Sequence, residues 1–155
     1  MTYTADGDTG LVFEVLPASY TDRIEFPAAP SAVRQARHWA ADLLGHSDPP
    51  PCQDLIDSAV LLVSELVTNA IRAGGHLHGQ AGYPDNAPIS LMITREPGTV
   101  RIEVHDSACG PVPLAGDRSA DAETGRGLMV IDALSRDWGW RPGRCGKVVW
   151  CELLA

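Results

Sequence analysis

The segment from Gln53 to about Ala73 constrains the fold of this 155-residue chain more than any other part. Its apolar residues form two adjoining rows at helical spacing, so a helix here has a wide apolar arc and should be largely buried. The helix should end at the pair Gly74–Gly75. The two rows consist of Leu55, Ala59, Leu62, Leu66, Ala70, and of Ile56, Val60, Val63, Val67, Ile71.

The flanking segments predict two more helices and five strands. Residues 22–26 alternate like a short strand, and Ser31 is placed to cap a helix that runs to about Leu44. A short helix is expected from about Gly127 to Ser135. The four remaining strands are expected at Ile89–Arg95, Thr99–Asp106, Asp137–Arg141 and Lys147–Leu154. This order predicts an α+β two-layer sandwich, with helices on one face of a mixed, mostly antiparallel sheet.

Length and composition predict one ordinary domain. Residues 1–18 lack a clear period and are expected to be a flexible arm, so the domain covers residues 19–155. A net charge of -8 argues against direct nucleic-acid binding, which needs a basic surface. No apolar run approaches the roughly 20 residues that span a bilayer, and no signal peptide is evident. Together with four scattered cysteines, these features lead us to expect a cytoplasmic protein.

Glu65 and Asn69 are the first candidate site residues. They are separated by four positions, so they share one face of the long helix. An amide oxygen is a suitable Mg²⁺ ligand, and a carboxylate one turn away can take a proton from a hydroxyl or a water. Taken alone, the same pair is better explained as the solvated polar edge of an amphipathic helix.

Asp106 is the second candidate, at the end of a predicted strand. It shares the parity of Val100, Ile102 and Val104, so its side chain should point to the apolar face. A carboxylate there can accept a hydrogen bond from an exocyclic amino group such as that of adenine, and this contact is selective. The alternative is an aspartate that opens a turn by bonding to nearby backbone.

The segment Thr124–Leu128 is the third candidate. Its glycines allow backbone N–H groups to approach a ligand closely, and the helix expected after it offers its N-terminus to phosphate. Arg126 adds a cation. A glycine-rich helix start without a ligand is the alternative. Residues 107–124 contain no predicted element and lie between two candidate motifs, so we expect them to form a lid.

The order of these motifs resembles the GHKL superfamily of gyrase-, chaperone-, histidine-kinase- and MutL-like ATPases. Within it, the chain is most similar to the anti-sigma-factor serine/threonine kinases and their ATP-binding relatives. The similarity extends over roughly residues 22–154. The segments that carry it are IEFPAAPSAVRQARHWAADLLG, SELVTNAIRAG, VRIEVHDSACGPVP, TGRGLMVIDALSRDWGW and GKVVWCELL.

The resemblance implies the Bergerat fold, with Mg²⁺ and ATP as its ligands. It implies that Asn69 binds Mg²⁺, that Glu65 is catalytic and that Asp106 binds adenine. Ala108 departs from the family, because it stands where the first glycine of the adenine box is usual, and the loop at residues 74–88 looks enlarged. The remaining nucleotide-binding positions implied are Ala73, Gly110, Gly125, Arg126, Gly127 and Leu128.

Three functions follow from this reading. The first is a serine/threonine kinase that phosphorylates a small anti-anti-sigma (STAS-like) protein and also binds a sigma factor, with a homodimer as a further expectation from relatives. The second is an ATP-binding module that sequesters a partner without phosphoryl transfer. The third is an interaction domain with a decayed pocket, which the presence of both Glu65 and Asn69 disfavours.

Overall fold

A computed structural model describes residues 19–75, 87–108, 122–144 and 146–155, with the backbone alone for 122–125. The described chain contains three helices and five strands. The helices are α1 (Ser31–Gly45), α2 (Gln53–Gly75) and α3 (Ala122–Leu134). The strands are β1 (Tyr20–Pro27), β2 (Pro88–Glu96), β3 (Thr99–Asp106), β4 (Asp137–Gly143) and β5 (Gly146–Leu154).

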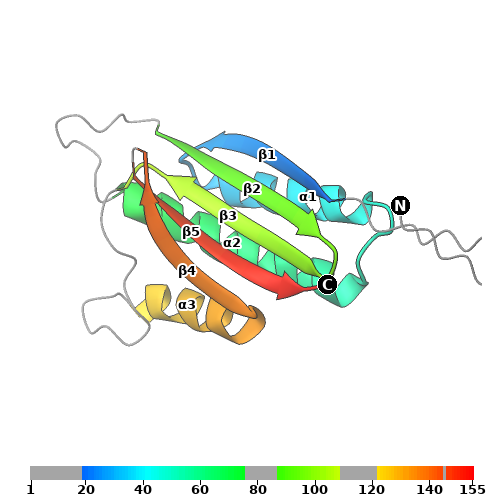
Figure 1. Ribbon diagram of the computed structural model, residues 1–155. Helices are drawn as coiled ribbons and strands as arrows, with labels where there is room; N and C mark the ends of the chain where they lie inside the picture. Colours follow the sequence, from blue (N-terminus) through cyan, green and yellow to red (C-terminus); the bar gives the residue numbers. More distant parts are fainter. Residues whose placement is uncertain (1–18, 76–86, 109–121, 145) are drawn as a thin grey trace, which may run out of the picture.

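The five strands form one sheet in the order β1-β2-β3-β5-β4, and the helices cover one of its faces (Figure 1). This arrangement confirms the predicted α+β two-layer sandwich. Every strand pairing among the described residues is antiparallel, so the described sheet has no parallel component. The antiparallel pairing of β3 with β5 brings together two segments that are distant in sequence, and it sets Asp106 opposite Lys147.

The core lies between the sheet and α2, as the two apolar rows of this helix predicted. Leu62, Val63 and Val67 are completely buried, and each such side chain contributes about 1.5–3 kcal/mol when it leaves water. The buried positions of α1 include three alanines, Ala32, Ala36 and Ala40. Their small side chains let α1 pack closely beside α2, and Leu44 is buried on the same face.

Two helix starts differ from those predicted. Ser31 is the first residue of α1 and does not cap it, because Pro30 occupies the capping position and no side chain caps the helix. Helix α3 begins at Ala122, ahead of the predicted start at Gly127. Ala122 and Glu123 favour helix, and Gly127 packs against α2, so the glycines here lie inside the helix and do not precede it.

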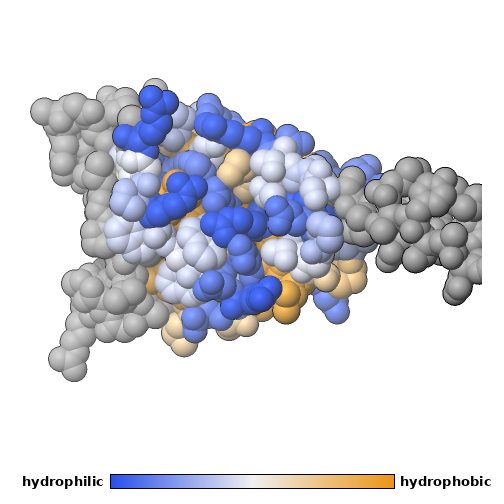
Figure 2. Space-filling view, in the orientation of Figure 1, coloured by the Kyte–Doolittle hydropathy of each residue, from blue (hydrophilic) through white to orange (hydrophobic). Residues whose placement is uncertain are grey.

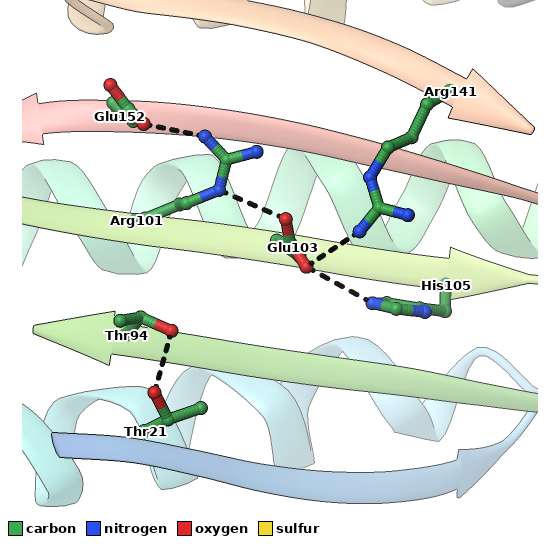
Figure 3. Close-up of polar contacts among 7 residues, drawn as sticks. All are labelled: Thr21, Thr94, Arg101, Glu103, His105, Arg141 and Glu152. Carbon is green, nitrogen blue, oxygen red and sulfur yellow. Dashed lines mark hydrogen bonds and ion pairs between the residues drawn. The ribbon is translucent and has the colours of Figure 1, made fainter. Parts of the chain in front are cut away.

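The opposite face of the sheet is polar, which explains why no described helix covers it (Figure 2). Glu103 lies at its centre with a side chain only 6 % exposed. The Arg101 guanidinium donates to Glu103 at 3.0 Å and to Glu152 at 2.6 Å, and Arg141 lies 3.4 Å from Glu103 (Figure 3). None of the helices in the described part of the chain is both long and apolar enough to cross a membrane.

Candidate functional site

Three of the predicted motifs reach the same end of the sandwich. The second half of α2, the end of β3 and the start of α3 all lie at the left of Figure 1. The strand β5 begins at this end as well, opposite the end of β3. The segments that carry the candidate residues therefore lie at one end of the sandwich. These residues are Glu65 and Asn69, Asp106, and the glycines of residues 125–127.

Gly127 brings the first and third motifs into contact. A Cβ atom at this position would lie 2.8 Å from Oε2 of Glu65 and 3.5 Å from Oδ1 of Asn69. The absence of a side chain at Gly127 is thus what lets α3 approach the polar stripe of α2. Glu65 and Asn69 are half-buried, so they are not the fully solvated edge of an amphipathic helix. The carboxylate, the amide and the glycine form one cluster.

The amide of Asn69 has an oxygen without a partner. Its Oδ1 atom is buried, and no group in the described part of the chain donates to it. A buried acceptor that is left unsatisfied costs free energy, so such an atom points to a missing donor or cation. An amide oxygen is a ligand that Mg²⁺ accepts, with phosphates and water completing its coordination. The residues present therefore fit a Mg²⁺ ion bound together with a nucleotide.

Asp106 ends β3 on the apolar face, as its strand parity predicted, and its side chain is 3 % exposed. Oδ1 accepts hydrogen bonds from the N–H of Ala108 at 2.8 Å and from Nζ of Lys147 at 3.1 Å. Burial raises the pKa of the Asp106 carboxyl above its ordinary value, although the Lys147 ammonium acts in the opposite direction. Oδ2 is buried and has no partner among the described residues.

The sequence left two interpretations open for Asp106, and the contacts of its two oxygen atoms are consistent with both. The bond from Ala108 is the local turn expected of an aspartate at a strand end, and it uses Oδ1 alone. The free Oδ2 atom is the acceptor that a purine amino group requires. The described contacts of Asp106 do not reach α2; they join it to Ala108 and to β5.

Lys147 and Gly146 are site residues that sequence reasoning missed. Lys147 is paired with Asp106 across the strands, and its side chain is 8 % exposed. Gly146 has φ +151, and a Cβ there would lie 1.9 Å from the carbonyl oxygen of Asp106. Strand parity contained a signal for Lys147, because Val149, Cys151 and Leu153 share its face and are buried. A lysine on an apolar face requires a carboxylate partner.

The other predicted positions are placed as follows. Ala73 is half-buried near the end of α2, and Arg126 is exposed. The side chain of Leu128 is completely buried in the core. Gly125 lies in the first turn of α3. Gly110, residues 109–121 of the expected lid, and the loop residues 76–86 lie outside the described residues, as does the expected arm at residues 1–18.

A comparison with protein families gives a match over most of the chain. The model of the histidine kinase-like ATPase domain matches residues 26–152, which include every described residue of the site. A search of curated proteins finds no match to the chain. The matched segment extends from the end of β1 into β5, so the family likeness covers nearly the entire described sandwich.

Proposed function

The chain belongs to the histidine kinase-like ATPase domain family, and we propose that it is a regulatory protein that uses Mg-ATP to phosphorylate a serine or threonine of a protein partner. The observation that carries this proposal is the cluster of Glu65, Asn69 and Gly127. A proton acceptor and a metal ligand lie one helical turn apart, and the missing side chain of Gly127 lets α3 pack directly against them. This combination suits chemistry at a phosphate group.

Each residue of the candidate site has a distinct role in the proposal. Asn69 would hold a Mg²⁺ ion through its free Oδ1 atom, and that ion would neutralise charge on the phosphates. The first turn of α3, with Gly125, directs unpaired backbone N–H groups at the phosphates, and Arg126 adds a positive charge. Asp106 accepts a hydrogen bond from the amino group of adenine through Oδ2. The protein thus acts mainly by positioning and electrostatics.

Glu65 is the general base of the proposed reaction. The oxygen of the acceptor hydroxyl forms a bond to the γ-phosphorus, the bond from that phosphorus to the bridging oxygen breaks, and ADP leaves. The proton of the hydroxyl passes to the Glu65 carboxylate. The half-buried position of Glu65 beside Gly127 supports this role, because a base must lie within hydrogen-bond reach of the reacting group.

The proposed partner is a small anti-anti-sigma (STAS-like) protein, with a sigma factor as a second partner, in the cytoplasm. The support for it is the resemblance of the motifs to anti-sigma-factor kinases. The acidic chain is consistent with a protein partner, since net charge disfavours nucleic acid.

Substitution of Glu65 by Gln tests the proposal, because glutamine keeps the shape of the side chain and removes the base. ATP affinity measured by calorimetry should stay nearly unchanged, and transfer of radiolabelled phosphate to the partner should fall by roughly 10²–10⁴-fold. Asp57→Asn is the matched control: it removes one exposed carboxylate from the same helix and should leave transfer unchanged.

Three outcomes separate the candidate functions. Full transfer by a folded Glu65→Gln protein would exclude Glu65 as the base. Tight ATP binding without transfer from the wild type, across a panel of STAS-like partners, would favour an ATP-binding module that sequesters its partner. Absence of any nucleotide binding would leave a domain with a decayed pocket and would contradict the proposal entirely.

A further inference from the structure

The ion pair of Asp106 and Lys147 leaves the carboxylate with one open acceptor atom. A carboxylate oxygen has two lone-pair positions. Both positions of Oδ1 are used, by the N–H of Ala108 at 2.8 Å and by Nζ of Lys147 at 3.1 Å. Only Oδ2 can accept from a ligand, since it is buried and without a partner in the described residues. An aspartate without these contacts would offer two acceptors side by side.

Lys147 also adds a group that can only donate. Its ammonium has three N–H bonds, of which one goes to Oδ1 of Asp106 and one to the carbonyl oxygen of Ala108 at 3.3 Å. The side chain is held there by the sheet, because β5 sets Lys147 opposite Asp106 and Gly146 allows the two strands to approach. A ligand at Asp106 therefore meets one acceptor next to a buried positive charge.

We propose that Lys147 is a specificity-determining residue that excludes guanine by restricting Asp106 to a single acceptor. This inference rests on the proposed binding of adenine nucleotides at Asp106. Adenine presents one exocyclic amino group next to N1, which accepts hydrogen bonds. Guanine presents two adjacent donors, N1–H and the 2-amino group, which a free carboxylate would accept together. With Oδ1 occupied, one of these donors faces the ammonium unpaired, and that contact is repulsive.

The wild-type protein gives a test that needs no substitution. ATP, GTP and ITP compete against a labelled adenine nucleotide in an equilibrium binding assay, where ITP lacks only the 2-amino group of GTP. ATP should bind most tightly, and GTP should bind no better than ITP, because the site has no second acceptor for the 2-amino group. GTP binding clearly tighter than ITP in the wild type would overturn the proposal.

Lys147→Met removes the ammonium and retains most of the apolar side chain. The ratio of ATP to GTP affinity should fall by roughly tenfold or more, which is the usual size of a paired contact to a base. GTP should then bind more tightly than ITP. Lys147→Thr is made in parallel, in case the methionine does not pack, and Arg144→Met is the matched control that removes one exposed cation. Thermal melting establishes that each protein is folded.

The outcomes distinguish this inference from the proposed function. A wild type that binds no nucleotide contradicts the function itself. A wild type that prefers ATP, with the same preference in a folded Lys147→Met or Lys147→Thr protein, overturns the inference alone. Loss of GTP and ITP affinity in these variants would show that the ammonium binds the 6-keto oxygen, which also overturns it. A relaxed preference in the Lys147 variants and an unchanged one in Arg144→Met is the expected result.

Discussion

The Gly127→Ala substitution tests whether the contact between α3 and Glu65 affects the proposed phosphoryl transfer or only the stability of the fold. The added Cβ would lie 2.8 Å from Oε2 of Glu65, where ordinary contacts begin at 3.4 Å, so the carboxylate must move by about 0.6 Å. The same Cβ meets the two amide atoms of Asn69 at 3.5 and 3.6 Å, which are normal contacts. The substitution therefore displaces the proposed base and leaves the proposed metal ligand in place.

The effect of Gly127→Ala on stability should be small. Alanine is favoured over glycine inside a helix by about 1 kcal/mol, and Gly127 lies inside α3. The opposing cost is modest, because the crowded atom is the end of a flexible glutamate side chain and can rotate away. We expect the free energy of unfolding to change by no more than about 1 kcal/mol in either direction.

The effect on phosphoryl transfer should be much larger. A displacement of this size at a reacting group typically lowers the rate by about 10- to 100-fold, and ATP affinity should change little. Single-turnover transfer, calorimetry with ATP and urea unfolding measure the three quantities. Gly45→Ala is the control, since a Cβ at the end of α1 meets nothing within 4 Å. Unchanged transfer in a folded Gly127→Ala protein would refute the contact between α3 and Glu65 as a functional one.

Two further predictions concern the metal and the outer face of the sheet. Asn69→Ala should abolish the Mg²⁺-dependence of nucleotide binding, because its buried Oδ1 atom is the proposed ligand; an identical Mg²⁺ response in calorimetry would contradict this role. Glu103 has its pKa lowered: burial opposes ionisation, but the hydrogen bond and charge of Arg101 and the charge of Arg141 outweigh it. A lowered pKa gives stability that is present above the ordinary value of 4.5 and lost as the pH falls through the folded pKa. Glu103→Gln should therefore be less stable than wild type at pH 7, by about 1–3 kcal/mol, and the difference in urea unfolding should shrink below pH 4.5. A constant difference would exclude this linkage.

The parts of the fold that the sequence predicted are those with strong periodicity. The two apolar rows of α2 located the core, and the alternation in β3 correctly placed Asp106 on the buried face. These patterns work because burial of apolar area dominates the free energy of folding. The start of α3 was placed too late, since Gly125 and Gly127 suggested a turn. The contact of Gly127 with α2 is a tertiary effect that local sequence does not reveal.

Lys147 could not be assigned a role from sequence because its partner depends on strand register. The parity of β5 predicts that the side chain faces the core, but it does not say which carboxylate lies opposite. Lys147 lies opposite Asp106 because β3 and β5 are neighbours in the sheet, although α3 and β4 separate these two strands in the chain. The resemblance to known ATPases includes the segment GKVVWCELL, which contains Lys147, but it assigned a role only to residues that match the ligand motifs and none to Lys147.

The two halves of the site differ in how the fold holds them, and this difference suits their proposed tasks. Asp106 and Lys147 lie on adjacent strands, opposite each other in the ladder, so their separation is set by backbone hydrogen bonds. A rigid pair of this kind favours discrimination between bases, because a mismatched donor cannot be accommodated by movement. Glu65 lies where α2 meets Gly127 of α3, so the position of its carboxylate depends on how closely the two helices pack. A base must lie within hydrogen-bond reach of the hydroxyl from which it takes a proton, so the proposed reaction depends on this packing. The proposal thus assigns base selectivity to the sheet and placement of the base to the paired helices, which predicts that substitutions at Lys147 alter nucleotide preference and substitutions at Gly127 alter rate.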